Sequence, residues 1–335
     1  MKKKGLFLMS LVLILAFVFV LTGCGDPEEV DPDEPVEERI DIATATTGGT
    51  FYPLGIALSH LLEQQIDGLR ASASSSAGSV ENIALLRGGE TTMAIIQNNI
   101  GQWAYEGIEA FEGEPLEDLR MVMPIVVSGY HLLVDEASDI DSWQDVEGTR
   151  FVIGRAGSGN ESSCAAIFDA LGYSFDDINP ERIGHSEGFD AVQDGRVDGM
   201  LALGGIPMGG ISDALMTPGS RAKLVDIPLE EAETINEQYP WIFPFTIPAG
   251  TYPDQDEDVQ ALGHNAYILT TEGMLSEELV YEIVMTTFDE DNIQVLLDSH
   301  DAFNNHAFMS PEEYLDFPIP LHPGAERAYE ELGLL

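Results

Sequence analysis

Residues 40–66 read IDIATATTGGTFYPLGIALSHLLEQQI, and the fold prediction starts from this stretch. Residues 40–45 form a short, mainly apolar segment that predicts a β-strand. Residues 53–66 place leucine, isoleucine and alanine at helical spacing and predict an amphipathic helix. A loop with glycines at 48 and 49 and several threonines joins the two. A strand, a glycine loop and a helix in this order predict the start of an α/β fold.

The same arrangement recurs along the chain. Further strands are predicted at 69–74, 93–97, 150–153 and 197–203, and further helices at 80–87, 161–171 and 188–193. Ser79 is a candidate N-cap for the helix at 80–87. A second glycine loop, 154–160, lies between a predicted strand and the helix at 161–171. This alternation favours α/β lobes with largely parallel sheets. We expect two such lobes to face each other across a cleft.

The N-terminal segment is predicted to lie outside this fold. Residues 1–23 begin with three lysines and continue with an apolar run, which is typical of a secretory signal peptide. The run ends in Leu21-Thr-Gly-Cys24, which resembles a lipobox, so Cys24 is the expected lipidation site and the new N-terminus. A single membrane anchor is the alternative interpretation. Residues 24–38 are rich in proline and acid and predict a solvated tether.

The chain is strongly acidic, with 59 Asp and Glu against 14 Lys and Arg and a net charge of −45. Removal of residues 1–23 takes away three lysines and no acid, which leaves −48 and Lys223 as the single lysine. Nucleic acid is excluded as a partner, because phosphate binding needs clustered Lys and Arg. A hydrophobic content of 44% argues against disorder. The acidity instead indicates a halophilic protein that works in concentrated salt, where screening weakens carboxylate repulsion.

No sequence motif points to catalysis, a metal or a cofactor. The stretch Gly157-Ser-Gly-Asn160 lacks the lysine of a phosphate-binding loop and the full glycine pattern of a dinucleotide fold. The seven histidines show no zinc-binding spacing, and no complete calcium loop is present. We therefore predict a protein that is not an enzyme, with no catalytic residues, no metal ligands and no cofactor.

The glycine loops themselves suggest a binding site. Each loop begins a helix, so free backbone N–H groups and a partial positive charge of roughly +0.5 lie at its end. Such a helix N-terminus can hold an anion without a lysine. The alternative is that the glycines only permit tight turns. Two matched loops in two lobes favour a ligand.

Five stretches of the chain resemble one family of proteins in their letters and order. They are TTGGTFYPLGIAL (46–58), SAGSVENIALLRGGE (76–90), GSGNE (157–161), IPAGTYPDQDEDV (247–259) and IPLHPGAERAYEELG (319–333). They closely resemble the TAXI family of solute-binding proteins, the extracytoplasmic receptors of a class of TRAP transporters. The resemblance runs in order over nearly all of residues 40–333.

This resemblance implies a type II periplasmic-binding-protein fold, with two α/β lobes and a hinged ligand cleft. Lobe 1 would comprise residues 39–128 and 264–335, and lobe 2 residues 129–263. Members of the family are associated with glutamate, glutamine, 2-oxoglutarate and related carboxylates. By analogy, the expected ligand-binding residues are Thr47, Gly49, Thr50, Phe51, Tyr52, Ser79, Gln97, Asn98, Ser158, Gly159, Asn160, Gly205 and Ile206.

Two residues depart from the family pattern. Thr92 stands where the family usually has an aspartate, and Arg155 stands where a small or apolar residue is expected. An arginine beside the second glycine loop could clamp a carboxylate with two hydrogen bonds. It could equally pair with an acid on the protein surface. Both departures concern the identity of the ligand.

The leading functional hypothesis is a lipid-anchored receptor outside the cytoplasmic membrane. It would capture a small carboxylate and deliver it to the membrane subunits of a TRAP permease. The first alternative is a ligand-sensing lipoprotein that partners with a signalling receptor. The second is a surface enzyme of the same two-lobed shape, which would need an activated nucleophile that the sequence does not show.

Overall fold

The computed structural model describes residues 38–335. The predicted signal peptide, Cys24 and nearly all of the predicted tether lie outside the described residues. Within residues 38–335, no helix has the length and apolar character needed to cross a lipid bilayer.

The described chain alternates strands and helices. The strands are β1 (Glu38–Ala43), β2 (Leu69–Ser74), β3 (Met93–Gln97), β4 (Leu119–Asp135), β5 (Arg150–Val152), β6 (Asn179–Glu181), β7 (Gly199–Gly204), β8 (Ala222–Val225), β9 (Phe243–Ile247) and β10 (Val259–Thr271). The α-helices are α2 (Phe51–Gln65), α3 (Ser79–Gly88), α4 (Asn98–Glu106), α5 (Gly159–Leu171), α6 (His185–Gln193), α7 (Gly209–Met216), α8 (Leu229–Gln238), α9 (Glu277–Thr287), α10 (Glu290–Ser299), α11 (His306–Met309) and α12 (Pro323–Leu332). Short 3-10 helices are η1 (Glu109–Phe111), η2 (Trp143–Val146), η3 (Phe175–Asp177), η4 (Asp301–Phe303) and η5 (Pro311–Tyr314).

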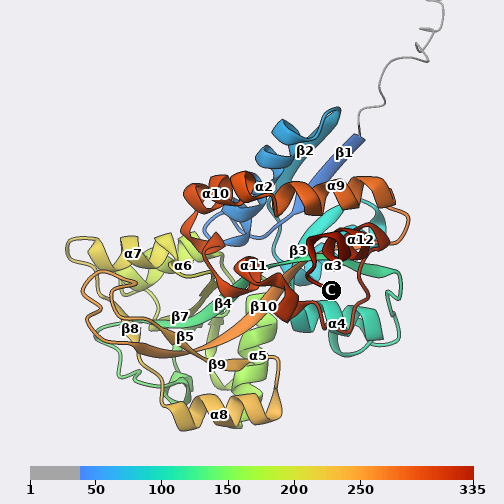
Figure 1. Cartoon of the computed structure of the whole chain (residues 1–335). Helices are drawn as coiled ribbons and strands as arrows, with labels where there is room; N and C mark the ends of the chain where they lie inside the picture. The colour runs from blue at the N-terminus through green and yellow to red at the C-terminus, as the bar shows by residue number, and fades with distance from the viewer. Residues whose placement is uncertain (1–37) are drawn as a thin grey trace, which may run out of the picture. The chain divides into compact units, whose positions relative to one another are not determined.

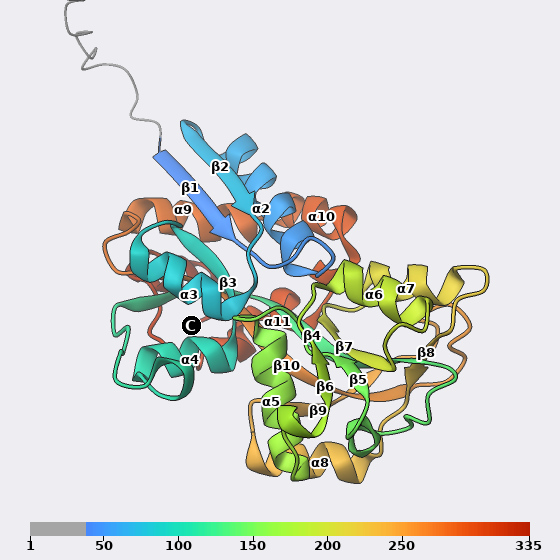
Figure 2. The same cartoon turned by 180° about the vertical axis from the view of Figure 1, so that it is seen from behind.

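All ten strands belong to one hydrogen-bonded sheet. Its main order is β2-β1-β3-β10-β4-β7-β5-β6, while β8 pairs with β4 and β9 pairs with β10. The strands at each end are parallel, whereas β10 runs antiparallel to both β3 and β4. The long strands β4 and β10 run through the middle, with α2, α3 and α9 beside one end of the sheet and α5 to α8 beside the other (Figures 1 and 2). Largely parallel sheets were expected in the lobes, and the structure adds the antiparallel strand β10, which with β4 joins both lobes in one sheet. Strands of 17 and 13 residues are long enough to pair at both ends.

The buried hydrophobic residues divide in the same way. One cluster draws on residues 40–126 and 266–329. Two others draw entirely on residues 130–262. This grouping supports the proposed division, in which β4 and β10 carry the chain between the lobes, and we use the names lobe 1 and lobe 2 in that sense.

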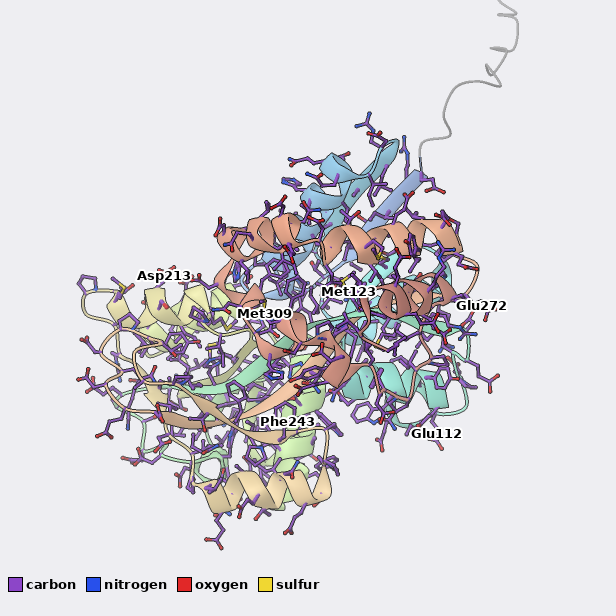
Figure 3. All side chains as sticks on the ribbon, in the orientation of Figure 1. Glu112, Met123, Asp213, Phe243, Glu272 and Met309 are labelled. Carbon is purple, nitrogen blue, oxygen red and sulfur yellow. The ribbon has the colours of Figure 1, made fainter. Side chains whose placement is uncertain are left out.

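The surface carries the acidic side chains and the interior the apolar ones. Glu112, Asp213 and Glu272 are exposed and project outwards, whereas Met123 on β4 is fully buried (Figure 3). Because β4 packs on both faces, nearly every residue along it is buried. This explains why its sequence is mainly apolar on both faces and does not alternate between apolar and polar residues.

Most predicted elements of the first half are present, with shifted ends. β2 and β3 have the predicted bounds, and α5 ends at Gly172, which adopts a left-handed φ of 87° as its C-cap. The predicted N-cap role of Ser79 was wrong. Ser79 is the first residue of α3, the cap position is Gly78, and the Ser79 hydroxyl accepts a hydrogen bond from the Gln97 N–H at 3.1 Å.

We predict that acid destabilises the fold through its buried histidines. Burial lowers the pKa of His131 and His185 to about 4 and that of His264 to about 3, from 6.5. Below pH 6.5 the unfolded chain therefore binds protons on these rings while the folded chain does not, so stability falls between pH 6.5 and about 4. Burial raises the pKa of Glu231 to about 7, which opposes the trend, but a single carboxyl opposes three rings. The melting temperature should drop over this window, and less steeply in His264→Phe. An equal drop in that variant would contradict the assignment.

Candidate ligand-binding site

The first wall of the site is the loop between β1 and α2. Fully buried Asn82 of α3 donates from Nδ2 to the Thr44 carbonyl oxygen at 2.7 Å. The Thr44 hydroxyl donates to the Ser74 carbonyl oxygen at 2.7 Å, which ties the loop to the end of β2. The Gly49 N–H donates to the Thr46 carbonyl oxygen at 2.9 Å and closes a turn. The loop is therefore held in one shape by buried hydrogen bonds.

The second wall is the loop between β5 and α5. Gly154 and Gly157 have φ values of +91° and +76°, which glycine adopts without strain. The Ser158 Oγ accepts from the Glu161 N–H at 3.2 Å, and the Glu161 Oε2 accepts from the Gly157 N–H at 3.1 Å. This reciprocal capping fixes the loop to the first turn of α5.

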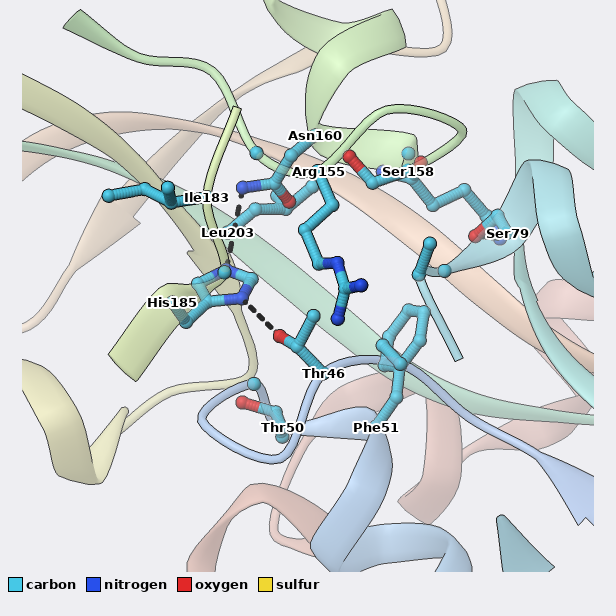
Figure 4. A pocket seen from close by; sticks show the side chains of 18 residues that line it. Thr46, Thr50, Phe51, Ser79, Arg155, Ser158, Asn160, Ile183, His185 and Leu203 are labelled. Atoms are coloured by element: carbon cyan, nitrogen blue, oxygen red, sulfur yellow. Dashed lines mark hydrogen bonds between the residues drawn. The ribbon is translucent and has the colours of Figure 1, made fainter. Parts of the chain in front are cut away.

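A cavity lies between these loops. Its volume, counted for the centre of a water-sized sphere, is about 40 Å³. Figure 4 shows side chains from both lobes around it: Thr46, Thr50, Phe51 and Ser79 from lobe 1, and Arg155, Ser158, Asn160, Ile183, His185 and Leu203 from lobe 2. A space of this size admits a few water molecules or the polar end of a small ligand.

Five helices begin at this cavity. The N-cap residues of α2, α3, α4, α5 and α6 all line it, and they are Thr50, Gly78, Gln97, Ser158 and Gly184. Among these five, only the Ser158 side chain accepts a hydrogen bond from its own helix. Each helix N-terminus carries a partial positive charge of roughly +0.5. The convergence makes the cavity attractive to an anion.

Several hydrogen bonds join the two lobes around the cavity. The Thr46 hydroxyl lies 3.1 Å from the His185 Nδ1, and the Gln97 Nε2 lies 3.4 Å from the Ser163 Oγ. The Glu81 N–H of α3 donates to the Gly157 carbonyl oxygen at 3.2 Å. Because each bond pairs a residue of lobe 1 with one of lobe 2, the cleft is closed in this structure.

His185 lies at the centre of the lobe 2 wall. The Asn160 Nδ2 lies 3.4 Å from its Nε2, and Thr46 approaches its Nδ1 (Figure 4). The side chain keeps some exposure to the cavity, but surrounding protein desolvates it and lowers its pKa to about 4. The ring is therefore neutral at pH 7 and can offer one donor and one acceptor.

Arg155 is the cation of the site. Elsewhere in the described residues, Lys223 and eight arginines form ion pairs with carboxylates. The Arg155 guanidinium forms no ion pair or hydrogen bond with any residue in 38–335, and the side chain extends from the lobe 2 loop towards Thr46 and Phe51 (Figure 4). The alternative in which Arg155 pairs with a surface acid is therefore not what the structure shows.

The structure brings eight of the predicted ligand-binding residues to the cavity wall. They are Gly49, Thr50, Phe51, Ser79, Gln97, Ser158, Gly159 and Asn160. The other five do not line it: Thr47, Tyr52, Asn98, Gly205 and Ile206. Thr47 faces two neighbouring pockets, and Gly205 leaves room for Thr50, since a Cβ there would lie 2.9 Å from its Cγ2. Contact with a bound ligand stays a prediction for all of the residues named in this paragraph as predicted.

Other residues of the wall were not predicted from the sequence. Thr46, Ile183, His185 and Leu203 are the main ones, with small residues between them. Gly184 and His185 are the N-cap and the first residue of α6, at the end of a third loop that follows β6. The sequence contains little indication of a strand before this loop, because β6 has three residues, Asn179-Pro-Glu, without an apolar pattern.

The single sheet, the two lobes and the cleft between them place this chain in the class of proteins with the periplasmic-binding-protein fold. A protein from Bordetella bronchiseptica RB50 matches with a TM-score of 0.53 and 11% identity, over 90% of this chain and 99% of its own. A structure described as a periplasmic transporter matches with a TM-score of 0.51 and 12% identity, over 89% of this chain and 93% of its own. The alkanesulfonate-binding protein SsuA from Xanthomonas axonopodis pv. citri, bound to MOPS, matches with a TM-score of 0.45 and 13% identity, over 89% and 84% of the two chains.

The sequence also matches a family model. Residues 42–333 match the model of the NMT1-like family, which is well over half of the chain. The chain therefore belongs to the NMT1-like family.

Proposed function

We propose that this protein is an extracytoplasmic solute-binding receptor that captures a small organic anion in the cleft between its lobes. The observation that carries the proposal is the electrostatics of the cavity. The N-cap residues of five helices line it, and the unpaired guanidinium of Arg155 lies at its edge. In a chain with 59 acidic residues, an arginine without a carboxylate partner is available for a ligand's carboxylate.

The binding mechanism follows from the contacts between the lobes. In an open form, the ligand would first meet the hydroxyl and amide groups of one wall. Closure would then bring the opposite helix N-termini and Arg155 to its other side, while Thr46 and His185 form their hydrogen bond. The ligand stabilises the closed form to the extent that it binds that form more tightly.

The type of transporter, the identity of the ligand and the attachment to the membrane are proposed from the sequence. The five stretches that resemble TAXI proteins support a receptor for a TRAP permease, with glutamate, glutamine, 2-oxoglutarate or a similar carboxylate as ligand. The Cys24 motif supports attachment to the membrane through a lipid. The solved structures named above share the fold with this chain, and their identities are too low to indicate its ligand.

The proposal is tested by the effect of small molecules on thermal stability. Mono- and dicarboxylates of two to six carbons are compared with neutral sugars and with diamines of similar size. We expect at least one carboxylate to raise the melting temperature in a saturable manner, because a ligand that binds only the folded state stabilises it. Saturable stabilisation by a sugar or a diamine, with none by any carboxylate, would overturn the proposal.

A further inference from the structure

We propose that the cavity selects a carboxylate without an ammonium group, so that it prefers 2-oxo or 2-hydroxy acids to the matching α-amino acids. The inference rests on the proposed function and narrows its ligand class. It follows from the charges on the cavity wall and from one buried amide oxygen that has no partner among the described residues.

The cavity wall repels positive charge. Its lining in the described chain includes the cation Arg155 and the five helix N-termini, and no aspartate or glutamate. The remaining polar side chains are neutral hydroxyls, amides and the His185 imidazole. A ligand ammonium would lose its water against positively polarised groups with no carboxylate to pair with. Burial of an unpaired charge is strongly unfavourable.

Three carboxylates lie close behind the wall: those of Glu81 and Glu161 accept hydrogen bonds from loop N–H groups, and that of Glu187 lies beside Gly184, where a Cβ would be 2.8 Å from its Oε2. The Glu81 carboxylate accepts a hydrogen bond from the Ala77 N–H. The Glu161 carboxylate accepts from the Gly157 N–H and pairs with Arg182 at 2.7 Å. Glu81 and Glu187 line the adjoining outer pocket, which Arg155 also lines. An ammonium that reached towards either one would therefore lie near the guanidinium.

The wall instead offers a partner for an uncharged polar group. Gln97 is 1% exposed, lines the cavity, and its Oε1 has no hydrogen-bond partner among the described residues. Its Nε2 faces Ser163, whose Oγ lies 3.0 Å from the Tyr130 hydroxyl. In this closed form the Oε1 is enclosed against Gly159 of lobe 2, where a Cβ would lie 1.6 Å from it, so a ligand hydroxyl that donates to it must enter at this seam between the lobes. With the amide turned by half a rotation, the NH₂ would donate to a keto oxygen.

The test uses ligands that differ only at one carbon. Binding of 2-oxoglutarate, 2-hydroxyglutarate and L-glutamate, and of pyruvate, lactate and L-alanine, is measured by titration calorimetry at pH 7.5. In the series that binds, we expect the dissociation constant of the amino acid to be at least about 100-fold higher than that of the tighter-binding 2-oxo or 2-hydroxy acid. A factor of this size is expected for a buried charge without a partner. An amino acid that binds within threefold of its counterparts, or more tightly, overturns the inference and leaves the proposed function intact.

If neither series of ligands binds, the inference is tested with the small molecule that copurifies with the protein. The compound released on denaturation is treated with an amine-reactive reagent and analysed by mass spectrometry. A carboxylate that does not react supports the inference, and a carboxylate that reacts overturns it. A released compound with no acidic group overturns the proposed function itself.

A variant tests the physical cause. Gln97→Glu places a carboxylate on the cavity wall, so the ratio of the two dissociation constants should shift towards the amino acid by at least about tenfold. Gln294→Glu on α10 adds the same charge at an exposed position and should leave the ratio unchanged. Circular dichroism and melting confirm that both variants fold. An unchanged ratio in folded Gln97→Glu contradicts the electrostatic explanation.

Discussion

Arg155→Gln is expected to weaken binding of the anionic ligand by about 10- to 150-fold, which corresponds to the loss of a charge-assisted hydrogen bond of about 1.5–3 kcal/mol. The fold should be unaffected, because Arg155 is exposed and has no ion pair to lose within residues 38–335. Arg155→Lys should recover part of the affinity, since it keeps the charge but loses the planar fork. Titration calorimetry with the ligand found in the thermal screen measures all three proteins.

The matched control is Arg196→Gln, which also removes one arginine from lobe 2. Arg196 is exposed and pairs with Asp194 at 3.3 Å, away from the cavity wall. Arg196→Gln removes the same positive charge as Arg155→Gln. The comparison therefore separates a local contact of Arg155 with the ligand from a general effect of net charge. Equal dissociation constants for Arg155→Gln and Arg196→Gln would show that Arg155 does not touch the ligand.

Gly48→Ala is expected to lower affinity by about 5- to 150-fold, because overpacking of about 1–3 kcal/mol opposes the closed form. A Cβ on Gly48 would lie 2.4 Å from the Ser186 Oγ and 2.7 Å from the Ser186 backbone nitrogen. The side chain of Ser186 can rotate away, but its backbone cannot. Gly48 and Ser186 belong to opposite lobes, so the clash arises on closure and each lobe should fold normally. Calorimetry measures the affinity, and small-angle X-ray scattering should show that the variant compacts less with ligand.

Gly209→Ala serves as the control for this substitution. A Cβ on Gly209, at the start of α7, would have no heavy atom within 4 Å, so affinity and compaction should match wild type. The neighbouring Gly49 is less restrictive than Gly48, since its Cβ would lie 3.3 Å from the His185 Nδ1. If Gly48→Ala closes and binds like Gly209→Ala, the contact between the loop and Ser186 does not control closure.

The helices and strands that could be predicted are those whose local pattern of apolar and polar residues agrees with their burial in the fold. β2 and β3 had the predicted bounds, and a glycine with positive φ precedes each of them, Gly68 before β2 and Gly89 before β3. The single sheet could not be predicted, because it depends on antiparallel pairing of β10 with β3 and β4, and β10 lies far from both in the chain. Such pairing leaves no local trace in the sequence.

Residues of the cavity wall were predicted where a glycine loop precedes a helix. The loops before α2 and α5 gave Gly49, Thr50, Ser158 and Asn160, all of which line the cavity. The loop before α6 was missed, because its strand is short and contains proline. The role of Arg155 stayed open at the sequence level, since only the folded structure shows which arginines find a carboxylate partner.

The most direct test of the central claim is to identify what the cleft holds. The protein is purified under native conditions, and the small molecule released on denaturation is identified and counted by mass spectrometry, with Arg155→Gln prepared in parallel. We predict one small organic anion per wild-type protein and markedly less in the variant. A neutral or cationic compound, held at one per protein and retained equally by Arg155→Gln, would contradict a receptor for organic anions.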